Sequence, residues 1–337
     1  MTTIRYELEN ARTFDFAKLD SFADRTIFQS TAWLSFVTAT QNAEPVVASL
    51  RDGGETVGYF MGHVARKYGL KLLGSPLPRS TTYSMGFNLV PGYPRRKALE
   101  GLRAFAFKTL GCVHLEASDR FATEEDARAG RFDYSIVRGF EIDLRPDESV
   151  LLKGMNEGCR GSIRKAAKCG VTIEEAHDAG FARDYYAQFE DVMAKHSLAP
   201  PYAIDRVNAL IEHLRPSGNL LMLRARAKDG RCIATGIFPA FNKHMVFWAG
   251  ASWREHQHLR PNEPLIWHAM RHWKARGIST FDMGGGGEYK RKYGGYEIPV
   301  PWIRTSRFGA VSSLRNVAKT LVHLKERSMG AARQWCA

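Results

Sequence analysis

The sequence predicts an α/β fold in which one unit occurs twice. Two segments, 46–76 and 220–252, each contain a strand pattern, an Asp-Gly turn and two further strand patterns. An Asp-Gly pair supplies the positive φ angles of a tight hairpin, so it marks where the first two strands meet. Each segment is followed by a helix pattern, a glycine and one more apolar strand pattern. The repeated order predicts two tandem lobes, each a mixed, mostly antiparallel sheet flanked by helices.

The two copies agree in register as well as in order. Asp229 follows Asp52, and Ile233 follows Val57, at spacings that differ by a single residue. The apolar positions of the second helix recur close to the 3.6-residue period; they are Leu265, Ile266, Met270 and Trp273. Hairpin–helix–strand strings also recur by chance in α/β proteins, but the shared spacing favours a duplication.

The composition indicates a folded, basic protein. The chain has 337 residues, of which 44% are hydrophobic, enough for one large or two medium domains with a sizeable core. The net charge of +13 favours an anionic partner: a phosphorylated substrate, a nucleotide-bearing donor, nucleic acid or an anionic membrane surface. Charge alone does not choose among these, and a basic protein without an anionic ligand is the plain alternative. No recognised nucleic-acid motif occurs, so we expect no specific DNA binding.

The cysteines and the N-terminus predict a cytoplasmic protein without a metal site. The five cysteines are an odd number and show no CxxC spacing, so neither a zinc site nor a disulfide framework is expected. The first residues lack the apolar core of a signal peptide. No apolar run reaches the roughly 18 residues that a spanning helix needs.

Two segments resemble a known family. In residues 260–295, an RPN segment opens a helix, a strand ends in Asp-Met-Gly-Gly, and a Tyr-Lys-Arg-Lys segment leads to a glycine. This order resembles the C-terminal signature of FemAB-like transferases. Residues 151–173 resemble the basic interlobe helix of the same family, which ends in Lys-x-Gly-Val. The order of elements in each lobe is similar to the GNAT (GCN5-related N-acetyltransferase) fold.

The resemblance implies a domain organisation and an activity. It implies GNAT-like lobes over 1–150 and 151–310, and a basic amphipathic helix over 311–337 that packs back on the first lobe. It implies transfer of an acetyl or aminoacyl group to an amine of a sugar, peptide or cell-envelope precursor. The alternative is a non-catalytic module that keeps the transferase fold and binds anions or a membrane surface.

The acyl donor implied by the family is either acetyl-coenzyme A or aminoacyl-tRNA. Single-lobe acetyltransferases bind the coenzyme A pyrophosphate on a glycine-containing loop that enters a helix. The equivalent stretch here, 256–262, has no glycine, so its backbone approaches a pyrophosphate less closely. Arg260 and Asn262 are the candidates for donor binding in this stretch.

The glycine-rich segment 281–295 has three interpretations. A phosphate cradle of the kinase type is disfavoured, because no GKS or GKT ending is present. A hairpin with a charged rim is the structural alternative. An acyl-transfer loop fits the chemistry, because the reaction passes through an oxyanion that needs a nearby cation or amide. Lys290 and Lys292 would share one face if this segment is extended, and the resemblance assigns transition-state stabilisation to Lys292. The other predicted contacts are Asp282, as an anchor of the loop, and Gly285 and Tyr289, as substrate-binding residues.

Two carboxylates near the end of the first lobe's last strand are candidates for the proton chemistry. Glu116 falls where the resemblance places an acidic residue, and Asp119 follows three positions on. Either is predicted to take the proton of the acceptor amine or to orient that amine. A carboxylate at a strand end is otherwise a cap.

Two basic helices predict anion contacts. Arg160, Arg164 and Lys168 form one stripe at i, i+4 and i+8. Their mutual repulsion would be relieved by a phosphate of an acceptor or of RNA, to which arginine offers two parallel hydrogen bonds; a solvated face is the alternative. In the C-terminal segment, the apolar stripe comprises Val311, Leu314, Val317, Leu321 and Leu324. It predicts docking on the first lobe, or else contact with an anionic membrane surface.

Overall fold

Both Asp-Gly turns form β-hairpins in the computed structural model, which describes residues 4–309. Gly53 and Gly54 have φ angles of +60° and +93°, and Gly230 has +84°. These are the values for which a hairpin turn selects glycine. The predicted C-terminal helix lies outside the described residues. None of the helices within the described range is long and apolar enough to cross a bilayer.

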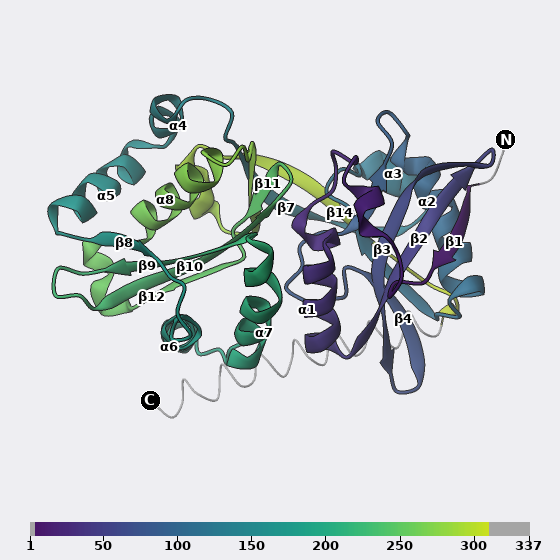
Figure 1. Ribbon diagram of the computed structural model, residues 1–337, viewed down its shortest axis with the longest axis horizontal. Coiled ribbons are helices and arrows are strands. Elements are labelled where there is room, and N and C mark those ends of the chain that lie inside the picture. Colours follow the sequence, from purple (N-terminus) through teal and green to yellow (C-terminus); the bar gives the residue numbers. More distant parts are fainter. Residues whose placement is uncertain (1–3, 310–337) are drawn as a thin grey trace. The chain divides into compact units, whose positions relative to one another are not determined.

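The chain forms two compact units. The first consists of residues 4–137 and 299–309, and the second of residues 138–298. Strands β7 (Asp133–Asp143) and β14 (Tyr296–Ser306) carry the chain from one unit to the other. Each unit has its own set of paired strands and its own hydrophobic core (Figure 1).

The first unit is a sheet with helices on both faces. Its strands are β1 (Arg5–Glu9), β2 (Ala43–Asp52), β3 (Glu55–Lys67), β4 (Leu70–Ser75), β5 (Gly86–Leu89) and β6 (His114–Ser118). Its helices are η1 (Phe16–Leu19), η2 (Ile27–Gln29), α1 (Thr31–Gln41), α2 (Arg95–Ala104), the π-helix η3 (Phe105–Thr109) and α3 (Glu124–Ala129). The strand order is β1-β2-β3-β4-β6-β14, with β5 on β3, and the only parallel neighbours are β4 and β6 among these described strands.

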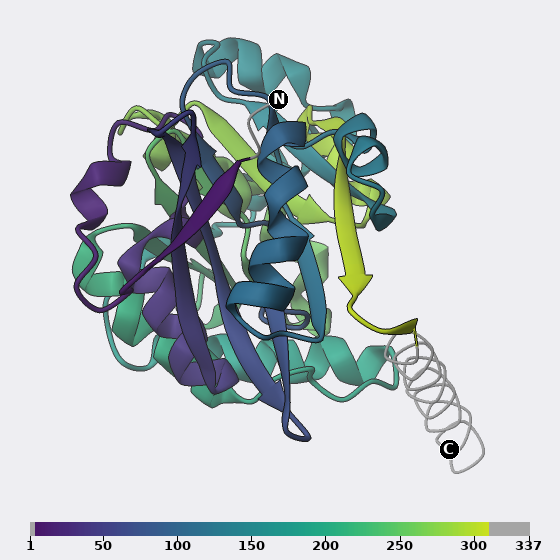
Figure 2. The ribbon, with the colours of Figure 1, turned by 90° about the vertical axis from the view of Figure 1, so that its right-hand side faces the viewer.

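Successive side chains of β3 point to opposite faces of the sheet, and each face is covered by a helix. Phe60 and Val64 join Leu102 of α2 in one core, whereas His63, on the opposite face, lies 3.3 Å from the carbonyl oxygen of Leu34 in α1. Figure 2 shows α2 lying along the strands on one face of this sheet. α1 begins where Ser30 accepts a hydrogen bond from the amide of Trp33.

The second unit follows the same plan. Its helices are α4 (Glu148–Gly154), α5 (Glu157–Lys168), α6 (Phe181–Lys195), α7 (Ile204–Leu214), η4 (Arg215–Ser217), η5 (Arg254–Leu259), α8 (Asn262–Lys274) and η6 (Glu288–Tyr293). Its strands are β8 (Thr172–Glu175), β9 (Leu220–Arg226), β10 (Cys232–Phe241), β11 (His244–Val246), β12 (Ala249–Ser252) and β13 (Thr280–Gly285). The order is β7-β13-β11-β10-β9-β8, with β12 on β10. α6 and α7 lie on one face, and α8 with α5 on the other (Figure 1).

The predicted periodicity of α8 is confirmed by its buried face. Leu265, Ile266, Met270 and Trp273 are all buried and belong to one core cluster. In that cluster they meet Phe238 of β10 and Phe281 of β13, so the helix is held on the sheet by apolar packing.

In each unit, the strand before the long helix is interrupted at the same point of the sheet. This shared irregularity agrees with the predicted repeat of one plan. In the first unit, β4 pairs in parallel with β6, and β5 returns to β3 only after residues 76–85. In the second unit, β11 pairs in parallel with β13, and β12 continues on β10 after Phe247 and Trp248. The fold is therefore two tandem lobes, each mostly antiparallel with one parallel pair around its long helix.

Candidate active site

The sheet of the second unit opens where β12 and β13 diverge. The last backbone bond between these arms runs from the amide of Phe247 to the carbonyl of Asp282, at 2.8 Å. Beyond it, within the described residues, β12 has a strand partner only in β10. The amide of Trp253 donates to the carbonyl of Ile233, its partner across the β12–β10 pair. Successive residues of an antiparallel strand direct their backbone groups to alternate sides, so the backbone groups of Gly250 and Ser252 face away from β10. We call this divergence, from Phe247 to Ser252 on one arm and from Asp282 to Gly287 on the other, the splay.

The equivalent position in the first unit is bridged. The amide of Met85 donates to the carbonyl of Ser118 at 2.8 Å, and the amide of Phe87 donates to Asp119 Oδ2 at 3.0 Å. Arg95 donates to the same oxygen of Asp119 at 2.7 Å. A Cβ at Gly86 would lie 2.6 Å from Asp119, so the two arms are in close contact there.

A chain of polar contacts links the two arms of the splay through α8 and η6. Asn262, the first residue of α8, donates to Ser252 Oγ at the end of β12, at 3.2 Å. Its neighbour Glu263 accepts from Lys292 of η6 at 2.6 Å. Lys290 of the same η6 donates to the carbonyl oxygens of Met283 and Gly285 on β13, at 2.5 and 3.0 Å. The ends of β12, α8 and β13 are thus linked through η6.

Lys290 and Lys292 do not share one face, contrary to the sequence prediction. That prediction assumed an extended segment, whereas residues 288–293 form a 3₁₀ helix, in which positions two apart point in different directions. Lys290 is buried and turned toward the carbonyls of the glycine loop, and burial lowers the pKa of its ammonium. Lys292 points to α8 and is half-buried.

The Lys292 ammonium is held by a buried carboxylate and two aromatic rings. Glu263 is 7% exposed and sits in the first turn of α8, where the helix dipole favours a negative charge. Lys292 Nζ lies 5.1 Å from the ring centre of Tyr293 and 5.8 Å from that of Tyr289. Tyr293 is buried, whereas Tyr289 is 53% exposed. The amine is therefore fixed in place while one side of its surroundings stays open to solvent.

The glycine loop between β13 and η6 is set by its backbone. Gly284, Gly286 and Gly287 have φ between +70° and +84°, which disfavours any side chain. Asp282 is buried, and its Oδ1 accepts from the amide of Gly284 at 2.7 Å.

The loop that enters α8 carries Arg260 in a left-handed conformation. Its φ is +58°, a region where glycine is the usual residue. The amides of His256 and Arg260 already donate to the carbonyls of Trp253 and Gln257. These two amides are therefore engaged, and an anion here would be bound chiefly by side chains.

The two arginines predicted on α5 differ in their surroundings. Arg160 donates through Nη1 to the carbonyl of Lys153, at 3.0 Å, and to that of Met155. Arg164, one turn further on, is exposed. Cys159, which directly precedes Arg160, lies in the core, and burial with nearby Glu263 raises the pKa of its thiol to about 11, which disfavours a nucleophilic role.

Glu116 and Asp119 lie in the first unit, and both are buried. Glu116 Oε1 is 3.1 Å from His114 Nε2, and its Oε2 accepts from Trp302 Nε1 at 2.7 Å. Asp119 also accepts from the amide of Phe121 at 2.8 Å. Burial raises the pKa of Asp119, although Arg95 opposes the shift.

Glu263 is a site residue that was not predicted from the sequence. The signal was present, because an acidic residue in the first turn after an RPN segment commonly caps a helix. Its partner lies 29 positions further along the chain, and nothing in local spacing connects the two.

Comparison with known proteins follows the same division into units. Residues 154–293 match a family model described as an acetyltransferase (GNAT) domain. No curated protein matches the sequence.

Solved structures match over most of the chain at low sequence identity. A crystal structure of FemX has a TM-score of 0.70 at 12% identity, covering 88% of this chain and 97% of FemX. A tandem GNAT protein from the clavulanic acid biosynthesis pathway has a TM-score of 0.53 at 14% identity, covering 89% and 97%. L-PGS from Bacillus licheniformis has a TM-score of 0.51 at 11% identity, covering 90% and 96%.

At these identities the structural matches show the fold alone, and the family match shows a similarity that is confined to the second unit. The chain thus has the tandem GNAT fold, and its residues 154–293 are similar to an acetyltransferase (GNAT) domain.

Proposed function

We propose that this chain transfers an acetyl or aminoacyl group to an amine of a sugar, peptide or cell-envelope precursor, with the acyl donor bound in the splay of the second unit. The GNAT domain supports acyl transfer in general. The names of the structural neighbours, FemX and L-PGS, motivate the choice of envelope precursors as acceptors.

The observation that carries this proposal is a difference between the splay of the second unit and the equivalent position in the first unit. The position in the first unit is bridged by Asp119 and by the backbone of Met85. The splay of the second unit leaves the backbone groups of Gly250 and Ser252 directed away from β10. An amide-containing donor arm can pair with such a strand edge by β-type hydrogen bonds.

Lys292 has the position and charge to act on the developing oxyanion. Attack of an amine on an acyl carbon moves negative charge onto the carbonyl oxygen, and a fixed cation stabilises that charge. Glu263 holds the ammonium at 2.6 Å, so little reorganisation is needed during the reaction. Glu116 stays the proposed base that takes the amine's proton.

The donor is proposed to be acetyl-coenzyme A or an aminoacyl-tRNA. Since the loop before α8 has a non-glycine residue in its left-handed position, donor phosphates would be held by side chains such as Arg260. The positive net charge and the exposed Arg164 suit either donor, and also a phosphorylated acceptor.

Binding and transfer assays on the full chain test the proposal. Isothermal titration with acetyl-coenzyme A and filter binding with charged tRNA would identify the donor, and mass spectrometry would detect the acylated amine. Lys292→Met should lower turnover about 10²–10³-fold, whereas Arg291→Met, at the neighbouring exposed position, should not. The absence of binding to both donors would overturn the proposal.

A further inference from the structure

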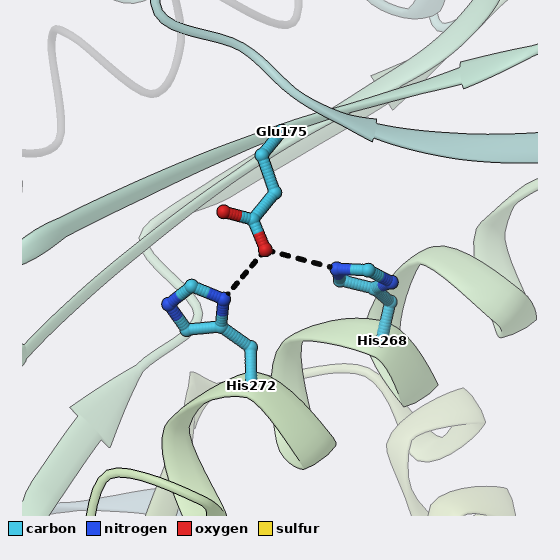
Figure 3. A group of neighbouring side chains, drawn as sticks. All are labelled: Glu175, His268 and His272. Atoms are coloured by element: carbon cyan, nitrogen blue, oxygen red, sulfur yellow. Dashed lines mark hydrogen bonds and ion pairs between the residues drawn. The ribbon is translucent and has the colours of Figure 1, made fainter.

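Three metal-ligating side chains converge between α8 and the edge strand β8. Glu175 Oε1 lies 2.7 Å from His272 Nδ1 and 3.3 Å from His268 Nε2 (Figure 3). One ligand atom from each residue lies within 4.8 Å of the other two. Both imidazoles are directed at the same carboxylate oxygen.

Local geometry explains the convergence. His268 and His272 are four residues apart on α8, so they lie on one face of the helix. Glu174 and Glu175 are neighbours on β8 and point to opposite faces of the sheet. Glu174 pairs with Arg226, and Glu175 faces α8.

The two histidines and the glutamate differ in their exposure to solvent. The backbone at His272 is fixed in part by a hydrogen bond, because its carbonyl accepts from Arg276 Nη1 at 3.0 Å. The His272 side chain is 10% exposed, against 33% for His268 and 37% for Glu175.

We propose that Glu175, His268 and His272 bind a divalent transition metal, with zinc the best match. Two imidazoles and one carboxylate are a ligand set that zinc uses in proteins. With metal–ligand bonds of about 2.0–2.2 Å, tetrahedral geometry places ligand atoms about 3.3–3.6 Å apart. The 3.3 Å separation already fits, and the 2.7 Å separation needs a small side-chain adjustment.

The bound metal would join the edge of the sheet to its covering helix. β8 has four residues and pairs only with β9 in the described part of the chain. A metal shared with α8 would fasten this short strand at its last residue. Three protein ligands leave a fourth position for water.

Zinc titration of the EDTA-treated full chain tests this site. Isothermal titration with ZnCl₂ and elemental analysis after dialysis should give one tightly bound zinc per chain. Loss of outer-sphere partners alone commonly weakens metal binding 10- to 100-fold, so His268→Gln and Glu175→Gln should each weaken zinc binding at least about tenfold. His196→Gln, at an exposed histidine outside the cluster, is the matched control and should leave affinity unchanged.

A second readout separates metal binding from a structural role of the same hydrogen bonds. Zinc should raise the melting temperature of the wild-type chain and of His196→Gln, but not that of Glu175→Gln, because only a ligand bound to the folded state stabilises it. Co²⁺ should give a tetrahedral visible spectrum in the wild type that is lost in His268→Gln. Equal zinc affinity in the wild type, His268→Gln and Glu175→Gln would overturn the proposal and identify the binding as adventitious.

Discussion

Lys292 Nζ and Glu263 Oε1 lie 2.6 Å apart and join η6 to the first turn of α8. Glu263 is almost fully buried and Lys292 is one-quarter exposed. The pair therefore has two consequences that can be separated: it stabilises the second unit, and it holds the ammonium that we propose acts on the oxyanion.

Removing the lysine should affect stability as well as turnover. The position of Lys292 after a glycine-rich loop, where packing contributes little, would by itself predict an unchanged melting temperature for Lys292→Ala. With its partner buried, the substitution leaves a carboxylate unsatisfied and should cost about 1–3 kcal/mol. Thermal melts of Lys292→Met, Glu263→Gln and the double variant would measure the coupling.

The double variant should recover stability but not turnover. Uncharged groups at both positions remove the unpaired charge, whereas the oxyanion still lacks its cation. Wild-type turnover in Lys292→Met at limiting substrate would show that the lysine is a structural residue only.

The two carboxylates of the first unit should respond differently to amide substitution. Asp119 accepts from Arg95 and two backbone amides, so Asp119→Asn should lower the melting temperature. Glu116 accepts from Trp302, a bond that glutamine can retain. If Glu116 is the base, Glu116→Gln should lower turnover about 10²–10⁴-fold with a smaller change in stability. The reverse order of effects would exclude Glu116 as the base.

Arg160 and Arg164 give a matched comparison on α5. Arg160 bonds two backbone carbonyls, so Arg160→Ala should lower the melting temperature. Arg164 is exposed, so Arg164→Ala should leave the melting temperature unchanged but weaken binding of uncharged tRNA or pyrophosphate at low salt. The difference should shrink at physiological ionic strength, where exposed charges are screened over about 8 Å. Unchanged affinity at low salt would identify the stripe as a solvated face.

His63 predicts a loss of stability on mild acidification. It is fully buried, and burial lowers its pKa from 6.5 to about 4. Between these values the unfolded chain binds a proton that the folded chain excludes, so stability falls as the pH drops from 6.5 to 4 and this contribution is constant below 4. The contribution is on the order of 3 kcal/mol. Melts of the wild type and His63→Gln across this range would test it, and parallel pH profiles would contradict it.

The duplicated plan could be predicted from sequence because its signals are local. The Asp-Gly turns and the period of α8 depend on neighbours within a few residues. The contacts of the site could not be predicted in the same way. Glu263 meets Lys292, and Glu175 meets His272, only after a helix has packed on a sheet. A shared face for Lys290 and Lys292 requires an extended segment, whereas the glycine-rich segment continues into a 3₁₀ helix.

The unequal splays of the two lobes have a consequence for stoichiometry. A chain with two copies of one donor-binding fold would ordinarily be expected to titrate with two equivalents. In the first unit, Asp119 after β6 accepts hydrogen bonds from the amide of Phe87 in β5 and from Arg95. These internal hydrogen bonds occupy the strand edge that a donor would otherwise use. Saturation should therefore occur at one donor molecule per chain, and a second equivalent should bind only if those internal fastenings are removed.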